Sequence, residues 1–152
     1  MFRCPMRESR SKHIELHGIE ATTLTQLVEY MYTSEIIVTE DNVQTLLPAA
    51  DFLLMRAVRE KCCEFLESHL HVSNCLGIRK FAVFYNCSSL RRSCESFIIR
   101  NVSEVLKTEE FTRLNPDELL EFASIFASNI PLRNDLRAYA EFVRQSVNEQ
   151  RR

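Results

Sequence analysis

Glycine and proline are rare in this chain, and their scarcity limits the folds it can adopt more than any other feature. The 152 residues include two glycines and four prolines, whereas these two residue types make up about 12% of an average protein. Sandwiches, barrels and propellers need many tight turns, which use glycine and proline. The two glycines, Gly18 and Gly77, are also too far apart to form a phosphate-binding loop. The sequence therefore predicts a mainly α-helical protein.

The composition is that of a globular protein with a core, because 45% of the residues are apolar and 26% are charged. The net charge of −2 gives no overall field that would attract nucleic acid or a membrane. The charge is uneven locally: residues 79–100 contain five basic residues and one acid, and residues 103–121 contain six acids and two basic residues. Most such runs are solvated helix faces, and a docking surface is the alternative interpretation.

Apolar residues recur at helical spacing along most of the chain. In the first stretch, Leu24, Leu27 and Met31 lie on one helix face, and the same period returns between residues 40 and 143. We expect Thr39 to cap the second helix and Pro48 to kink it or end its regular hydrogen bonding. Two short alternating or β-branched runs, residues 12–16 and 36–38, are predicted to form strands.

A strong helix start follows near the middle of the acidic stretch. Asn115 is placed to cap a helix, Pro116 suits the first turn, and Glu118 can reach back to the cap. Beyond this helix, residues 136–143 have the spacing of a last amphipathic helix.

The cysteines and histidines do not have the spacing of a metal site. The six cysteines include no C-x-x-C pair, and His69 and His71, two residues apart, point to different sides of a helix. Most of the cysteines occupy or flank apolar positions, so we expect buried, unreactive thiols. Cys4, beside Arg3, is the one candidate for an exposed reactive thiol. With no nucleophile–base pair and no phosphate loop, we predict no enzymatic activity, no cofactor and no metal.

The first ten residues lack the apolar stretch of a secretory signal, and the longest apolar run, residues 81–85, is too short to cross a bilayer. We therefore expect an intracellular protein, cytoplasmic or nuclear, with reduced thiols.

Several strings of residues together resemble the BTB–BACK region of kelch-like proteins. They are ESRSKHIEL, LVEYMYTSEIIVTEDNVQTLLPAADFLLM, VREKCCEFL, SNCLGIRKFA, YNCSSL and IIRNVSEVLKTEEFTRLNPDELL, with a weaker match in IPLRNDLRAYAEFV. The resemblance covers nearly the whole chain and implies the C-terminal half of a BTB/POZ fold in residues 1–70. It also implies stacked helical hairpins of a BACK domain in residues 71–152.

The resemblance implies a substrate adaptor of Cullin-3 ubiquitin ligases. In that family the BTB domain dimerises and binds the N-terminal domain of Cullin-3, the BACK helices extend the cullin groove, and a kelch propeller binds the substrate. The family's cullin-binding signature, a hydrophobic residue, any residue and then Glu, matches Met6 and Glu8. The other positions implied to face the cullin are Tyr30, Tyr32, Asp51, Phe52 and Leu54. Leu76, Ile78 and Phe81 could extend the groove, although we favour a place in the core for them.

Compared with the family pattern, the chain has no first half of a BTB domain, a shortened BACK region and no kelch repeat. We therefore expect the faces led by Leu27, Met31, Leu47 and Phe52 to lack cover and to favour association, with BTB-containing chains as further partners. The alternative function is a truncated fragment that competes with the full-length adaptors or recruits no ligase.

Overall fold

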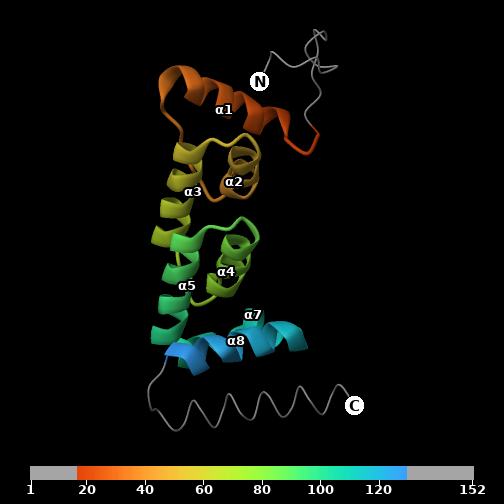
Figure 1. Cartoon of the computed structure of the whole chain (residues 1–152), viewed down its shortest axis with the longest axis vertical. Helices are drawn as coiled ribbons and strands as arrows, with labels where there is room; N and C mark the ends of the chain where they lie inside the picture. Colours follow the sequence, from red (N-terminus) through yellow and green to blue (C-terminus); the bar gives the residue numbers. More distant parts are fainter. Residues whose placement is uncertain (1–16, 130–152) are drawn as a thin grey trace. The chain divides into compact units, whose positions relative to one another are not determined.

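The computed structural model describes residues 17–129, and the secondary structure of this part of the chain is helical (Figure 1). The mainly α fold class is thus confirmed. The helices are α1 (Ala21–Thr33), α2 (Val43–Phe52), α3 (Arg56–Ser68), α4 (Cys75–Phe84), α5 (Ser88–Arg100), α6 (Val102–Val105), α7 (Glu109–Thr112) and α8 (Pro116–Asn129). The predicted strand at 12–16 and the predicted helix at 136–143 lie outside the described residues.

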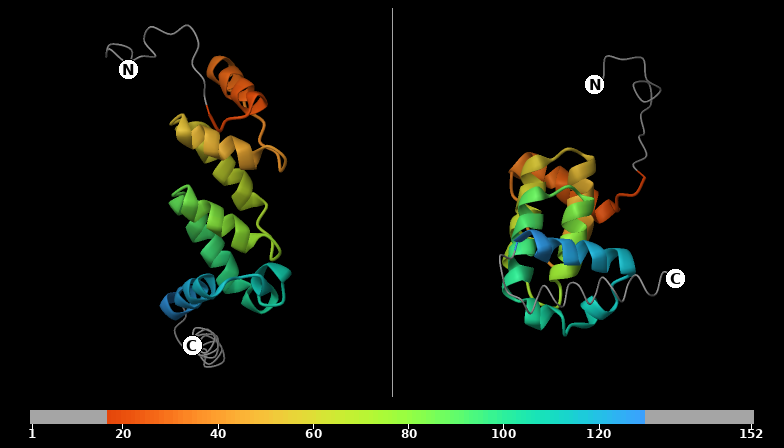
Figure 2. Two further views of the ribbon diagram at one scale, coloured as in Figure 1. Left: turned by 90° about the vertical axis from the view of Figure 1, so that its right-hand side faces the viewer. Right: turned by 60° about the horizontal axis from the view of Figure 1, so that its bottom comes forward.

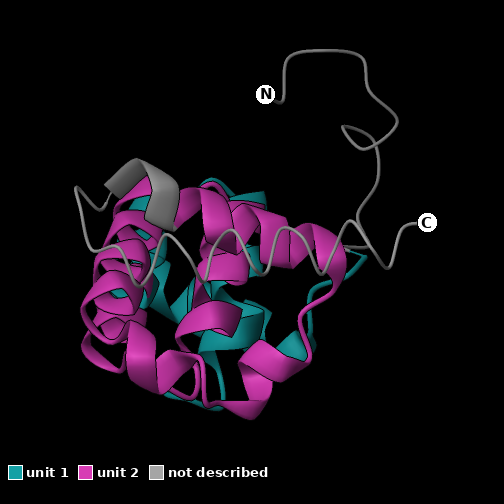
Figure 3. Ribbon diagram, turned by 90° about the horizontal axis from the view of Figure 1, so that it is seen from below, with its two compact units in different colours: residues 1–62 teal, residues 63–152 magenta. Residues whose placement is uncertain are grey.

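The chain divides into two compact units, residues 1–62 and residues 63–152 (Figure 3). The division falls inside α3. The predicted domain boundary between residues 70 and 71 comes from the resemblance to a sequence family, whereas the two units are defined by contacts within the structure. The boundary therefore stays a prediction.

In the first unit, α1 packs against α2. The hydroxyl of Thr23 donates a 3.1 Å hydrogen bond to the hydroxyl of Thr45 between these helices. Leu27 and Leu47 are 1% and 0% exposed, so the expectation that their faces lack cover is wrong for both residues, since α1 and α2 contribute to a common core. That expectation does hold for Met31 and Phe52, which are exposed.

The predicted strand at 36–38 does not form. Residues 34–39 have no regular secondary structure, and Ile37 is exposed. A strand needs a partner strand for its backbone groups, and residues 17–129 supply none. Instead, the side-chain amide of Asn42 donates to the carbonyl oxygen of Ile37 at 2.9 Å.

The predicted cap at Thr39 is wrong by about one turn, because α2 begins at Val43, its N-cap residue is Asn42, and that residue makes no side-chain cap hydrogen bond. The backbone N–H of Asn42 donates to Thr39 Oγ1 at 3.3 Å, and the backbone N–H of Thr39 donates to Asn42 Oδ1 at 2.8 Å. This reciprocal pair holds the turn of residues 39–42 that leads into α2. Pro48 lies inside α2 without ending it, because the helix continues to Phe52.

The second unit is built on a helical hairpin of α4 and α5, which lie side by side (Figures 1 and 2). The short helix α7 packs on α4, and α8 packs on α5. Buried side chains of these helices and of α6 form one core cluster, which consists of Cys75, Leu76, Ile98, Val105, Phe111 and Phe122. The predicted capping box at α8 is confirmed: the N–H of Asn115 donates to Glu118 Oε2, and the N–H of Glu118 donates to Asn115 Oδ1, both at 2.9 Å.

The two helical hairpins, α2–α3 and α4–α5, are a structural repeat of 32 residues. Every helix boundary in the second hairpin lies 32 positions after its counterpart in the first, from 43 and 75 at the start to 68 and 100 at the end. The entries match, since Asn74 accepts from the N–H of His71 and donates to the carbonyl of His69, as Asn42 does with Thr39 and Ile37. The local backbone of the two hairpins is therefore built in the same way.

Candidate partner-binding surface

Seven residues are predicted to face a partner, and five of them fall in the described part of the chain. Met6 and Glu8 lie outside it. The other five are Tyr30, Tyr32, Asp51, Phe52 and Leu54, and all of them belong to the first unit.

Three of these five residues meet at the turn between α2 and α3, which we call the α2–α3 corner (Asp51, Phe52 and Leu54). Phe52 is 65% exposed at the end of α2, and Leu54 is 88% exposed two residues later. The Asp51 carboxylate lies 3.3 Å from an Nη atom of Arg59 on α3. The corner therefore presents two apolar side chains beside an ion pair.

The backbone of the α2–α3 corner is fixed by hydrogen bonds. The N–H of Leu54 donates to the carbonyl of Asp51 at 3.1 Å, and the N–H of Met55 donates to the carbonyl of Ala50 at 2.8 Å. Leu54 has a φ of 57°, in the left-handed region, which is unfavourable for residues with a branched or bulky side chain.

The two tyrosines lie on α1 and differ from each other in exposure. Tyr30 is half-buried, and the Lys61 ammonium lies 5.5 Å from its ring centroid, a cation–π distance. Tyr32 is largely exposed. The ring of Tyr30 is thus partly occupied within its own unit, whereas that of Tyr32 is open to a partner.

Sequence reasoning did not single out two further apolar residues that the structure exposes, one in each unit. Ile37 in the first unit and Phe84 in the second are both 79% exposed. Phe84 is the last residue of α4 and the repeat counterpart of Phe52, so comparison of the chain with itself at a 32-residue offset would have found it. Leu76 is buried in the core cluster, in line with the interpretation favoured for it, and Ile78 and Phe81 are partly buried.

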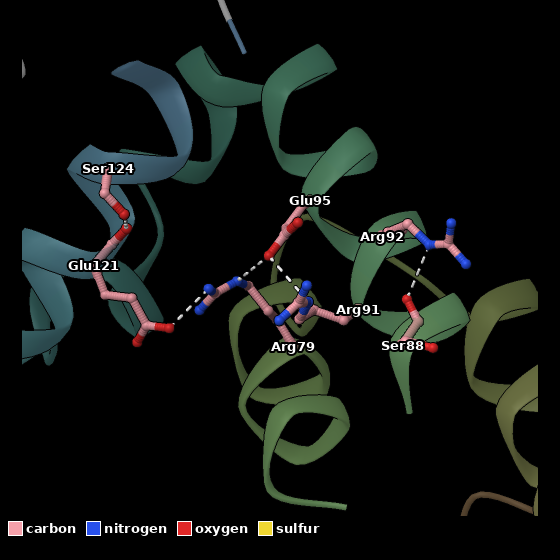
Figure 4. Close-up of polar contacts among 7 residues, drawn as sticks. All are labelled: Arg79, Ser88, Arg91, Arg92, Glu95, Glu121 and Ser124. Atoms are coloured by element: carbon pink, nitrogen blue, oxygen red, sulfur yellow. Dashed lines mark hydrogen bonds and ion pairs between the residues drawn. The ribbon is translucent and has the colours of Figure 1, made fainter. Parts of the chain in front are cut away.

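A buried arginine links three helices of the second unit (Figure 4). Arg79 on α4 donates from Nη2 to Glu121 Oε1 on α8 at 2.9 Å. Its Nε lies 3.4 Å from Glu95 Oε1 on α5, which is ion-pair distance without hydrogen-bond geometry. Arg91 approaches the same Glu95 oxygen at 3.7 Å. Because each of these charges has an opposite charge beside it, the network is suited to holding helices together rather than to chemistry.

The described cysteines are buried. Burial, with a smaller effect of the Glu110 carboxylate, raises the pKa of the Cys75 thiol to about 11. Burial and the neighbouring Cys75 raise the pKa of Cys94 to about 12. Both thiols are protonated at neutral pH, and a thiol is a poor nucleophile. Cys4 lies outside the described residues.

The histidines near the end of α3 are engaged in local contacts. The ring of His69 stacks on Phe65 with centroids 4.1 Å apart, and its Nδ1 lies 2.8 Å from the Phe65 carbonyl oxygen. Across residues 17–129, no three His, Cys, Asp or Glu side chains gather in a way that could hold a metal ion. In the same part of the chain, no helix combines the length and the apolar character that crossing a membrane requires.

Comparison with known proteins gives matches to two sequence families. Residues 1–70 match the BTB/POZ domain, and residues 75–129 match the BACK family, described as BTB And C-terminal Kelch. Kelch-like protein 17 of Mus musculus is 45% identical over 152 residues, which is 99% of this chain and 24% of that protein. Kelch-like protein 3 of Homo sapiens is 44% identical over 124 residues, covering 82% of this chain and 21% of that protein. The chain thus spans about a quarter of the length of these relatives.

Proposed function

Because this chain belongs to the kelch-like family of BTB–BACK proteins, we propose that it is a protein-interaction segment that docks on the N-terminal domain of Cullin-3. The docking surface that we propose is the α2–α3 corner together with Met6, Glu8 and Tyr32. Its role is that of a ligase adaptor, which brings a partner to the cullin and performs no catalysis itself.

The observation that carries this proposal is the conformation of Leu54. A leucine in the left-handed region is strained, and burial in its own unit does not compensate for this, because the side chain is 88% exposed. The repeat counterpart of Leu54 is Asn86, which has nearly the same φ of 52°. Asparagine tolerates this conformation much better than leucine. An apolar side chain held in an unfavourable conformation and displayed to solvent is therefore what a partner-binding position would look like.

Phe52 supports the same assignment. Its side chain is 65% exposed one residue before the turn, so it and Leu54 present two apolar groups close together in the chain. Apolar groups that a partner covers at the centre of an interface contribute most of its binding energy.

The test uses the substitution Leu54→Asn, for which the chain itself provides the precedent at Asn86. We expect the fold to be kept or slightly stabilised, because asparagine relieves the backbone strain. Loss of a leucine that becomes buried on binding removes about 1.5–3 kcal/mol. Isothermal titration calorimetry with the Cullin-3 N-terminal domain should therefore show affinity reduced about ten- to a hundredfold.

The matched control is Ile37→Asn, an equivalent change at another exposed apolar residue of the same unit. We expect it to leave the affinity within about twofold. If Ile37→Asn weakened binding as much as Leu54→Asn, or if neither did, the α2–α3 corner would not be the docking surface.

A second test addresses the N-terminal signature through the double substitution Met6→Ala, Glu8→Ala. Loss of binding in this variant would support the family docking mode. A chain that is folded by circular dichroism and still does not bind the cullin domain would contradict the proposal. That result would favour the alternative, a segment without ligase recruitment.

A further inference from the structure

The cluster of basic residues between 79 and 100 contains two arginines without an ion-pair partner in the described part of the chain. Arg79 pairs with Glu95 and Glu121, Lys80 pairs with Glu118, and Arg91 pairs with Glu95. The remaining two are Arg92 and Arg100, both exposed on α5. Figure 4 shows the Arg92 guanidinium directed away from the Arg79 network, with Nε donating to the Ser88 carbonyl at 3.2 Å.

These two arginines line one open pocket of about 420 Å³ in the second unit. Residues 92, 93, 96, 97 and 100 follow helical spacing and so lie on one face of α5. The apolar part of the lining is Phe97 and Leu70, both partly buried. The pocket thus combines two cations with an apolar surface and the hydroxyl groups of Ser93 and Ser96.

Glu67 is the one acid in the pocket lining. Its Oε1 accepts a hydrogen bond from the hydroxyl of Ser93, so the acid is held beside α5. The lining carries a net charge of +1, and a carboxylate placed next to Glu67 would be repelled. Because Ser93 is next to Arg92, an acid at Arg92 is attracted by that arginine and opposed by Glu67, whereas an acid at Arg100 is seven residues farther along α5. A ligand that uses both arginines and the apolar lining therefore needs two separated acids with an apolar group between them.

We propose that this pocket binds an extended acidic peptide segment in which an apolar residue stands between two acids, in the order acid–x–apolar–x–acid. Eight residues along α5 separate Arg92 from Arg100 by about 12 Å at 1.5 Å per residue. Four residues of an extended peptide span about 13 Å at 3.3 Å per residue. Alternate side chains of an extended peptide point the same way, so both acids and the apolar residue face the pocket together. The site shares no residue with the cullin-docking surface proposed above, so the two proposals can fail independently.

The probe is the capped pentapeptide Glu-Ser-Leu-Ser-Glu, and the control peptide is Glu-Leu-Ser-Ser-Glu, which has the same composition and charge but turns its leucine away. We would titrate each into the full ¹⁵N-labelled chain and follow the amide signals by NMR. We expect saturable shifts on α5 and near Leu70 for the first peptide, and affinity at least about threefold weaker for the control. Equal binding of the two peptides would show non-specific anion attraction and would overturn the proposal. The absence of saturable shifts would overturn it as well.

Three substitutions in the pocket and one control outside it locate the site. Arg92→Gln and Arg100→Gln should each weaken binding about two- to fivefold, as expected for an exposed charge pair. Arg113→Gln makes the same charge change outside the pocket and should have no such effect. Glu67→Gln removes the repulsive acid and should tighten binding about twofold. This variant therefore tests the proposal through an increase in affinity. If the Arg113 variant lost as much affinity as the pocket variants, or if Glu67→Gln weakened binding, the pocket would not be the site.

Discussion

A carboxylate from α7, more than 30 residues later in the chain, caps α4. Its removal should destabilise the second unit. Glu110 on α7 accepts from the backbone N–H of Gly77 at 2.7 Å through Oε1 and from the N–H of Leu76 at 3.2 Å through Oε2. Asn74, the residue before α4, provides no side-chain cap. Glu110 therefore satisfies two donors in the first turn of α4 and places a negative charge at the positive end of its dipole.

The expected magnitude follows from these two bonds. Loss of a helix cap costs about 0.5–2 kcal/mol, and a hydrogen bond to a charged group contributes about 1.5–3 kcal/mol. Because one of the bonds is long and the other is exposed, we expect Glu110→Ala to cost about 2 kcal/mol. Glu110→Gln keeps one acceptor oxygen and should cost about 1 kcal/mol. In urea unfolding followed by circular dichroism, 2 kcal/mol lowers the midpoint by about 1 M for an m-value near 2 kcal/mol/M.

The neighbouring Glu109 offers a matched control. It lies on the same short helix but pairs with Arg113 at 2.9 Å, where both side chains are largely exposed. An exposed pair of this kind contributes at most about 1 kcal/mol. If Glu109→Ala were as destabilising as Glu110→Ala, the cap would not be the reason for the loss.

Gly77 provides the sharper test, because a Cβ at this position would lie 2.7 Å from Glu110 Oε1. Alanine is favoured over glycine inside a helix by about 1 kcal/mol, but in the wild-type chain it would displace the capping carboxylate. Gly77→Ala should therefore be neutral or destabilising in the wild type and stabilising in the Glu110→Ala background. An equal effect in both backgrounds would refute the reasoning, since residues in contact should be coupled by about 1 kcal/mol here.

Two further predictions concern the same unit. Arg79→Lys should lower the free energy of unfolding by about 1–2 kcal/mol, because one ammonium group cannot reach both Glu95 and Glu121 as the guanidinium does. Urea titration measures this loss. An unchanged free energy of unfolding would mean that the network does not hold the helices together. A hydrogen bond from Lys80, together with the Asn115 N–H, lowers the pKa of Glu118 below its usual 4.5, so its contribution to stability is present above pH 4.5 and is lost as the pH falls through the lowered value. Glu118→Gln should flatten the decline in stability on this acid side, and an unchanged pH profile from pH 5 to 2 would contradict the assignment.

The parts of the fold that could be predicted from sequence depend on neighbours in the chain. The capping box at α8 follows from residues three positions apart, and the structure has it. The helical period also predicted the helix α1, but of the face predicted for it Leu27 is buried and Met31 is exposed. The strand at 36–38 was predicted wrongly because a strand depends on a partner elsewhere, which local β-propensity does not supply. The Glu110 cap joins residues 33 and 34 positions apart, and no local pattern announces such a contact.

In the candidate site, too, the sequence located the residues but did not predict the contacts they make. The resemblance to kelch-like proteins pointed to Asp51, Phe52 and Leu54, and the structure brings them together at one turn. Two properties of these residues could not be predicted from the sequence. Asp51 forms an ion pair with Arg59, and the backbone of Leu54 is in the left-handed region. Both facts depend on how α2 and α3 meet, which is a property of the packed chain.

The 32-residue repeat separates positions that build the hairpin from the position on which the proposed docking surface rests. Residues identical in the two hairpins include Asn42 and Asn74 at the entries and the buried Cys62 and Cys94, so these positions build the hairpin. Exposure alone does not identify a binding residue, because phenylalanine is exposed at the equivalent ends of both α2 and α4. At the left-handed position of the turn the hairpins differ: the second has asparagine, which suits this backbone, and the first has leucine, which does not. Since the backbone at this position does not require leucine and the unit does not bury it, this difference supports the proposal that a partner contacts Leu54.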